Sequence, residues 1–354
     1  MKIIAAYLPQ FHKIPENDEW WGEGFTEWTN VKKSMPLFDG HYQPRVPLKD
    51  NYYDLSDGLE IFNQMEMANA YGVNCFAIYH YWFCGKQLLE KPVDFLLDQT
   101  ELPIEFCFCW ANGAWTRTWD GDEYAKDILI AQQYGDISDW KRHYLYLCKF
   151  FMHPKYLKEG KSPVLIIYDA GSLENQYAMF KYWNYLANED GFDDIKIVTI
   201  RRISNMKCFP TYGDKIFDFE PFATLNYMND NEKKTMSKLY VTDENEYQVI
   251  NYKLFCEKMV ARRHLFNKSN YGLFVGWDNS PRRGKNTKLI FENNDPEVFE
   301  WVFEKQYNKS IQENNLYLYL NAWNEWSEGT YLEPDNKYKF GYLEAIRSVI
   351  ENEK

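Results

Sequence analysis

The sequence lacks the features that mark membrane and exported proteins. No stretch approaches the roughly 18 consecutive apolar residues of a membrane-spanning helix. The first apolar run, residues 3–8, ends at Pro9 and is shorter than the core of a signal peptide. The seven cysteines are odd in number, scattered and without a CxxC pair, which favours free thiols in a reducing compartment. We therefore expect a cytoplasmic protein with no membrane span.

Motifs of several enzyme classes are missing as well. The chain has no HxxH or HExxH pattern, no GxSxG elbow, no Walker A loop and no GxGxxG loop. Asp120 and Asp122 form a DxD, a pattern with which nucleotide-sugar glycosyltransferases hold a metal and a diphosphate, but no apolar strand precedes it. The formal net charge of −12 argues against a nucleic-acid partner. We expect no metal and no cofactor.

Apolar runs and helical periodicity alternate along the chain. Several of the runs are nearly continuous, as buried parallel strands are. Eight strands are predicted, at residues 2–8, 73–80, 104–110, 163–168, 195–201, 216–220, 272–277 and 316–323. Helices are predicted between most of them and at the end of the chain, at residues 59–71, 137–151, 173–188, 247–266, 296–307 and 338–350.

This alternation predicts an α/β fold of the (β/α)8 (TIM) barrel type, with long loops at its C-terminal face. The alternative is a doubly wound open sheet, which usually has a glycine-rich turn after its first strand when it binds nucleotides. Here Pro9-Gln-Phe-His12 follows that strand instead. We find no linker and no internal repeat, so we expect residues 1–354 to form a single catalytic domain.

Unusual side chains follow the predicted strands, where barrel enzymes place their chemistry. Aromatic residues make up 18% of the chain, and seven of its 13 tryptophans lie at or just past a strand end. This placement predicts a site lined with flat rings and hydrogen-bonding groups, which suits a sugar. The predicted substrate-binding residues are Tyr7, His12, Trp28, His80, Tyr81, Trp82, Lys86, Trp110, Asn112, Trp115, Arg117, Trp277, Asp278, Asn324 and Trp326.

Some of the polar residues that follow the predicted strands have simpler explanations than a role in the site. His80 could be a core histidine, and Asp169 and Glu220 could form structural ion pairs at the barrel end. Arg282 and Arg283 fit a solvated turn as well as a site.

Glu325 and Glu328 are the predicted catalytic residues. They follow the eighth strand and are flanked by Trp323, Asn324 and Trp326. On an extended strand a separation of three would point them to opposite faces, whereas on a turn they could converge, and Gly329 favours a turn. A pair of carboxyl groups is what acid/base attack on a glycosidic bond requires, because their repulsion raises one pKa.

Several motifs, taken in order, resemble those of the WbsX-type family, whose members are often labelled glycosyltransferases of bacterial surface-polysaccharide loci. The resemblance runs from residue 2 to about residue 345. It rests on Tyr7-Leu-Pro-Gln-Phe-His12, Trp20-Trp-Gly22, Gly24-Phe-Thr-Glu-Trp-Thr-Asn30, Gly40-His-Tyr-Gln-Pro44, Tyr79-His-Tyr-Trp-Phe83, Cys109-Trp-Ala-Asn112, Trp277-Asp-Asn279 and Asn321-Ala-Trp-Asn-Glu-Trp-Ser-Glu-Gly329.

That family is similar to glycoside hydrolase family 99, the endo-α-mannosidases and mannanases, through Asn324-Glu-Trp-Ser-Glu-Gly329 and Glu333-Pro334. The similarity implies a retaining barrel enzyme in which Glu325 helps the sugar's own 2-hydroxyl attack the anomeric carbon. Glu328 would be the general acid and then the general base. The function expected first is therefore a retaining, endo-acting glycoside hydrolase that acts on a bacterial surface polysaccharide or its precursor. A glycosyltransferase or transglycosylase, and a non-catalytic carbohydrate-binding barrel, are the alternatives.

Overall fold

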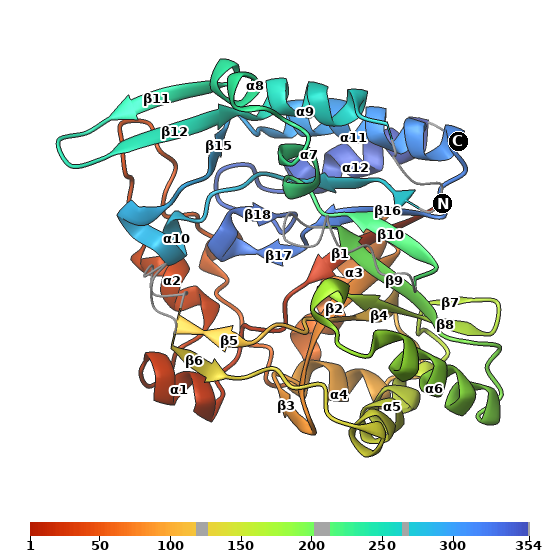
Figure 1. Cartoon of the computed structure of the whole chain (residues 1–354). Helices are drawn as coiled ribbons and strands as arrows, with labels where there is room; N and C mark the ends of the chain where they lie inside the picture. Colours follow the sequence, from red (N-terminus) through yellow and green to blue (C-terminus); the bar gives the residue numbers. More distant parts are fainter. Residues whose placement is uncertain (118–126, 202–212, 264–268, 353–354) are drawn as a thin grey trace.

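The computed structural model describes residues 1–117, 127–201, 213–263 and 269–352. Parallel strands form a nearly closed barrel with helices around it (Figure 1). The barrel strands are β1 (Lys2–Tyr7), β2 (Cys75–Phe83), β4 (Glu105–Trp110), β8 (Ser162–Ile167), β9 (Lys196–Arg201), β10 (Lys215–Asp218), β13 (Ser269–Asn270), β14 (Gly272–Phe274) and β16 (Tyr317–Asn321). Each of the eight predicted strand segments overlaps one of them, and the predicted fold class is confirmed.

The ring of strands closes at the seventh position, which is divided in two. There β13 pairs with β10, and β14 pairs with β16. The break falls at Tyr271, between the two pieces. Gly272 is required at this point, because a Cβ atom there would lie 1.8 Å from the carbonyl oxygen of Asp218. The close approach of two backbones therefore explains the glycine.

Helices connect most of the strands and cover the outside of the barrel (Figure 1). Capping groups mark where two of them begin. Asp136 accepts hydrogen bonds from two backbone amides ahead of α5, and Asp295 accepts one ahead of α11, which has a proline at its first position. The helices are α1 (Pro15–Trp21), α2 (Glu27–Lys33), α3 (Leu59–Ala70), α4 (Lys91–Leu97), α5 (Ile137–Phe151), α6 (Gln176–Glu189), α7 (Phe222–Leu225), α8 (Asp230–Thr235), α9 (Tyr252–Ala261), α10 (Ser280–Arg283), α11 (Pro296–Gln312) and α12 (Gly341–Asn352).

One predicted helix is wrong in its first part. Residues 247–251 belong to strand β12 (Glu246–Asn251), and of the described residues in the predicted range Tyr252–Ala261 are helical. Tyr247 and Val249 of β12 are buried while Glu246 and Gln248 are exposed, because one face of the hairpin packs against Ile290, Leu37 and Phe38 and the other faces solvent. This period-2 burial shows why the segment is a strand.

Small sheets and turns extend the loops. Antiparallel hairpins form from β2 with β3 (Lys86–Leu88), from β5 (Trp115–Thr116) with β6 (Ile128–Ile130), and from β7 (Lys158–Glu159) with β8. The hairpin of β11 (Ser237–Val241) and β12 pairs with β15 (Ile290–Glu292) and projects from the molecule (Figure 1). Finally, β17 (Asn324–Glu325) pairs with β18 (Thr330–Tyr331).

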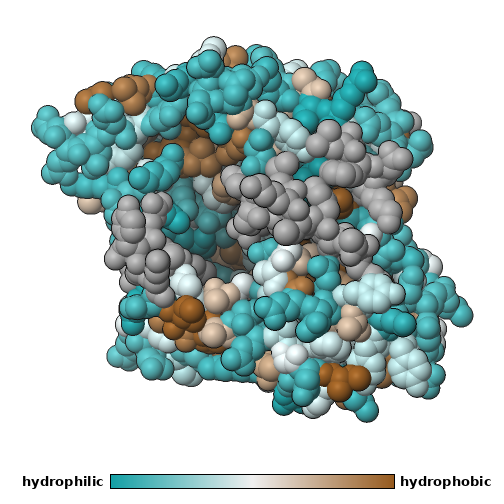
Figure 2. Space-filling model, in the orientation of Figure 1, coloured by the Kyte–Doolittle hydropathy of each residue, from teal (hydrophilic) through white to brown (hydrophobic). Residues whose placement is uncertain are grey.

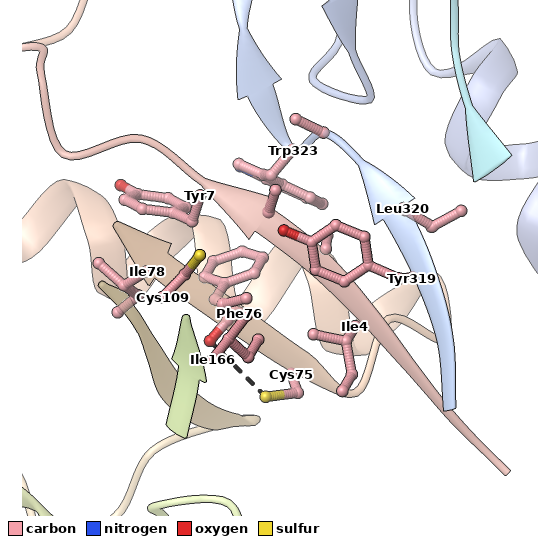
Figure 3. Packing of buried hydrophobic residues seen from close by; sticks show 14 of the residues in the cluster. Ile4, Tyr7, Cys75, Phe76, Ile78, Cys109, Ile166, Tyr319, Leu320 and Trp323 are labelled. Carbon is pink, nitrogen blue, oxygen red and sulfur yellow. Dashed lines mark hydrogen bonds between the residues drawn. The ribbon is translucent and has the colours of Figure 1, made fainter. Parts of the chain in front are cut away.

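The two faces of each barrel strand meet different surroundings. On β2, His80 and Trp82 contact His143 and Tyr146 of helix α5, on the outside of the barrel. Outward-facing Phe76 lies between Tyr7 and Trp323, with ring centroids 4.9 and 5.0 Å away (Figure 3). Cys107 and Cys109 are buried in the core, where they pack as small apolar side chains. The alternation decides which residues reach the barrel mouth.

Candidate active site

A cavity of about 310 Å³ lies at the carboxyl ends of the barrel strands. In the orientation of Figure 1, the surface is hollowed between the β11–β12 hairpin and the part of the molecule that holds α1 (Figure 2). The cavity is lined by residues at or just after the ends of six barrel strands, together with Arg282 of α10. They include Leu8, Gln10, Tyr79, Tyr81, Trp115, Tyr168, Asp169, Phe219, Asn321, Glu325 and Glu328.

A larger groove of about 580 Å³ lies nearby, between the end of α2, the turn of the β11–β12 hairpin and α10. Arg282 lines both spaces. We place the candidate active site in the smaller cavity, because both glutamates line it and neither lines the groove.

The two glutamates converge on one guanidinium group. Arg282 Nη1 lies 2.7 Å from Glu328 Oε1, and Arg282 Nη2 lies 3.0 Å from Glu325 Oε1. The side chain of Glu325 is 7% exposed and that of Glu328 is 21% exposed. The pair is therefore shielded from bulk water, and Glu328 is the more accessible of the two.

A short turn brings the pair together. Trp326–Glu328 form one turn of 3-10 helix, and Gly329 follows with a φ of +64°, a left-handed conformation that favours glycine. Asn324 fixes the start of the turn, since its side-chain amide donates to the carbonyl of Leu8 and accepts from the Leu8 N–H. The separation of three residues, which would oppose two side chains on a strand, thus lets them converge here.

The surroundings of Glu325 favour its protonated form. Burial raises the pKa of Glu325 well above the usual value, Arg282 opposes this, and the negative charges of Glu328 and Glu27 raise the pKa further. Two carboxyl groups of unequal burial, one with a raised pKa, are the asymmetry that acid/base chemistry requires.

Aromatic rings form walls of the cavity. Tyr79 and Tyr81 line it from β2, and their neighbours His80 and Trp82 face α5 instead. Trp115, at the start of the β5–β6 hairpin, packs edge-on against Tyr81 with ring centroids 5.2 Å apart. Of the predicted substrate-binding residues, the cavity contains Tyr81 and Trp115.

Most other predicted tryptophans lie in packed surroundings. Trp28 and Trp326 contact each other beneath the turn, and Trp326 Nε1 donates to Glu333 over 2.6 Å. Trp110 packs edge-on against His143, and Trp277 packs edge-on against Phe222. Each of these four indoles is at most 4% exposed.

The predicted histidines and Tyr7 are also buried outside the cavity. His80 Nε2 lies 2.9 Å from His143 Nε2, and burial lowers the pKa of His80 to about 3. The ring of His12 is enclosed, and burial lowers its pKa to about 4. Tyr7 donates to the side chain of Gln64 over 2.6 Å.

The remaining predicted polar residues support loops around the mouth. Asn112 bridges to the backbone of Asp169, which itself lines the cavity. Asp278 is fully buried and accepts a hydrogen bond from Gln43, with His41 Nε2 3.0 Å away. Lys86 pairs with Glu16 at the surface over 2.8 Å. Arg117 pairs with Asp127, with 3.8 Å between the charged atoms.

Several cavity residues are not among the substrate-binding residues predicted from the sequence, and three of them show why. From the sequence, Arg282 fits a solvated turn as well as a site, and only the fold shows that α10 brings it to the two glutamates. Tyr79 could have been found from the period-2 alternation with Tyr81. Tyr168 directly follows β8, where barrel sites gather. The ion-pair reading of Glu220 fits the structure, in which Arg262 lies 2.7 Å from it.

The described part of the chain contains no cluster of His, Cys, Asp or Glu suited to a metal ion. The DxD of Asp120 and Asp122 lies outside the described residues. Among the described helices, none is long and apolar enough to cross a membrane.

Comparison with solved structures finds barrels of similar fold. The endo-α-mannosidase of glycoside hydrolase family 99 from Bacteroides thetaiotaomicron aligns with a TM-score of 0.57 and 14% identity, over 99% of this chain and 96% of that one. A structure described as a glycoside hydrolase-like protein aligns with the same TM-score and identity, over 98% of this chain and 93% of that one. At this identity the likeness concerns the fold.

The sequence itself identifies the family. Residues 3–346 match the family described as Glycosyltransferase WbsX, and the chain belongs to it. An uncharacterised protein, WxcX, of Xanthomonas campestris pv. campestris is 32% identical over 351 residues, which are 98% of this chain and 49% of the relative. The chain thus spans about half the length of the curated relatives it matches.

Proposed function

We propose that this chain is a carbohydrate-active enzyme, a retaining glycoside hydrolase that acts within a bacterial surface polysaccharide or its precursor. The observation that carries the proposal is the convergence of Glu325 and Glu328 on Arg282, in a cavity at the carboxyl ends of the strands. The barrel shared with family 99 and the resemblance of the turn that holds the pair support it.

The chemistry follows from the two positions. The reactive form of the pair is the one that has Glu325 ionised and a proton on Glu328. Burial raises the pKa of Glu325, so its ionised form is a strong base. In the first step it takes the proton of the sugar 2-hydroxyl, whose oxygen bonds to the anomeric carbon as the glycosidic bond breaks. Glu328, the more exposed of the pair, gives its proton to the leaving oxygen.

In the second step Glu328 takes a proton from water, and the water oxygen bonds to the anomeric carbon. The bond from the 2-oxygen breaks, and that oxygen recovers its proton from Glu325. Two displacements at one carbon retain the configuration. Arg282 holds both carboxylates in place, and Tyr79, Tyr81 and Trp115 offer ring faces and hydroxyls to the sugar.

Transfer to a sugar hydroxyl instead of water is the second candidate, and the printed description of the WbsX family favours it. The same two carboxyl groups serve a transglycosylase, because an acceptor hydroxyl can take the place of water in the second step. A transferase that uses a nucleotide-sugar donor differs, since it releases a nucleotide.

The experiment is to incubate the protein with polysaccharide from its own source cell in ¹⁸O-labelled water, and to analyse released oligosaccharides by mass spectrometry. Hydrolysis places one ¹⁸O at each new reducing end, and transglycosylation places none. A parallel incubation with nucleotide sugars detects nucleotide release. Glu328→Gln is expected to abolish product, and Glu66→Gln, at an exposed glutamate of helix α3, is expected to retain the parent's rate.

Equal rates for Glu328→Gln and the parent would remove Glu328 from the mechanism. Nucleotide release that depends on acceptor would favour the transferase. Full affinity for the oligosaccharide without any turnover would indicate a carbohydrate-binding barrel.

A further inference from the structure

A third carboxylate approaches Arg282 from the opposite side of the turn. Glu27 is the first residue of α2, in the motif Gly24-Phe-Thr-Glu-Trp-Thr-Asn30, and its side chain is 1% exposed. Its Oε1 atom lies 3.3 Å from Arg282 Nη2, the nitrogen that also binds Glu325. A buried charge at this position needs an explanation, because burial is unfavourable without a partner.

The other oxygen of Glu27 binds the catalytic turn itself. Ser327, which lies between the two glutamates in the sequence, donates its hydroxyl to Glu27 Oε2 in a short hydrogen bond. Helix α2 therefore contacts both the guanidinium and the turn through one side chain. A single carboxylate thus links the three parts that set the positions of Glu325 and Glu328.

We propose that Glu27 is a positioning residue of the candidate active site, which orients Arg282 and the Trp326–Glu328 turn and adds a negative charge to the carboxyl cluster. The inference rests on the proposed function only for the reaction that the positioned groups perform. The geometry assigns Glu27 no contact with the cavity, since it is absent from the cavity lining. It acts on the reaction through its neighbours.

The charge balance at the cluster gives a consequence that can be measured. The groups facing Glu325 are Arg282 from α10, Glu328 from the same turn, Glu27 from α2 and Tyr81 from β2. Three carboxylates thus share the charge of one guanidinium. Replacing Glu27 by an amide removes one negative charge, so Glu325 should release its proton at lower pH.

The test is a pH titration of the glutamate carboxyl carbons by ¹³C NMR, on the whole chain without substrate. The Glu325 signal is assigned from its loss in Glu325→Gln. We expect its midpoint to fall by about 1 pH unit or more in Glu27→Gln. Glu27→Asp keeps the negative charge but moves it away by one methylene group, so we expect the midpoint of Glu325 to fall by less. Glu66→Gln, on the outer helix α3, should keep the parent's midpoint.

A folded Glu27→Gln or Glu27→Asp protein with the parent's midpoint would overturn the inference. A second readout uses the oligosaccharide assay, in which Ser327→Ala should lower kcat by about tenfold or more with little change in KM, because the reacting groups lose their alignment. An unchanged kcat would contradict the positioning role. If the parent shows no turnover on any carbohydrate, the proposed function fails, and the titration still decides whether Glu27 governs the cluster.

Discussion

Replacing Arg282 by methionine tests the electrostatics on which the site depends. The side chain of Arg282 is 9% exposed, and its guanidinium lies within 3.3 Å of Glu27, Glu325 and Glu328. Methionine keeps much of the apolar stem but leaves the carboxylates without their cation. Breaking a buried ion pair in this way costs about 3–5 kcal/mol of folding free energy.

The loss should depend on pH, and its direction can be derived. Without Arg282, the folded-state pKa values of the clustered carboxyls rise, so the folded protein keeps protons that the unfolded chain releases above about pH 4.5. The stability that these protonated carboxyl groups contribute to Arg282→Met is present below that pH and is lost as the pH rises. We expect the difference from the parent to be small near pH 5 and to reach about 3–5 kcal/mol near pH 8.

Urea denaturation at pH 5 and pH 8 measures both values. Arg142→Met is the matched control, because Arg142 pairs with Asp139 at the surface and its side chain is 56% exposed. Its loss should stay within about 1 kcal/mol at either pH. A loss for Arg282→Met that is equal at the two pH values, or below about 1 kcal/mol at both, would refute the reasoning.

Three other predictions concern one wall of the cavity and two buried side chains outside it. Trp115→Ala should weaken oligosaccharide binding about tenfold, or by roughly 1.4 kcal/mol, with a smaller effect on folding, because its ring lines the cavity; calorimetric titration measures it, and parent affinity would contradict it. Trp82→Ala should do the reverse, lowering the free energy of unfolding by about 3–5 kcal/mol with binding unchanged, because its ring stacks on His143. Burial raises the pKa of Glu333 to about 8, so the stability due to its protonated form is full below about pH 4.5 and is lost towards pH 8. Between pH 5 and pH 8, the free energy of unfolding measured in urea should therefore fall by roughly 2–4 kcal/mol less in Glu333→Gln than in the parent. The same pH dependence in both proteins would contradict the raised pKa of Glu333.

The fold could be predicted because barrel strands are buried on both faces. A run such as Ser162–Ile167 is wholly buried and almost entirely apolar, so it stands out from the helices around it. The segment at residues 247–251 could not be predicted in the same way. Its residues continue into a helix without a glycine or proline between them, and pairing with β11 and β15 makes them a strand.

The walls of the site were harder to predict than its centre, because residues were chosen by type and not by face. Tyr79-His-Tyr-Trp82 offers four attractive side chains in a row, and a strand can turn only alternate ones to the mouth. Tyr79 and Tyr81 line the cavity, whereas His80 and Trp82 pack on α5. An alternation rule applied to each strand end would have separated the two sets.

Arg282 and Glu27 needed the folded chain, because their partners are far away in sequence. Glu27, Arg282 and the turn at 325–328 come from three separate loops, and no local pattern links them. What the sequence does contain is a glutamate, Glu27, among apolar and aromatic neighbours at the start of a helix that is largely buried. A buried glutamate there requires a cation, and a cation beside two further carboxylates requires the turn. The two motifs, at residues 24–30 and 321–329, therefore form one electrostatic unit, in which neither glutamate of the pair keeps its position or its protonation without the other loops.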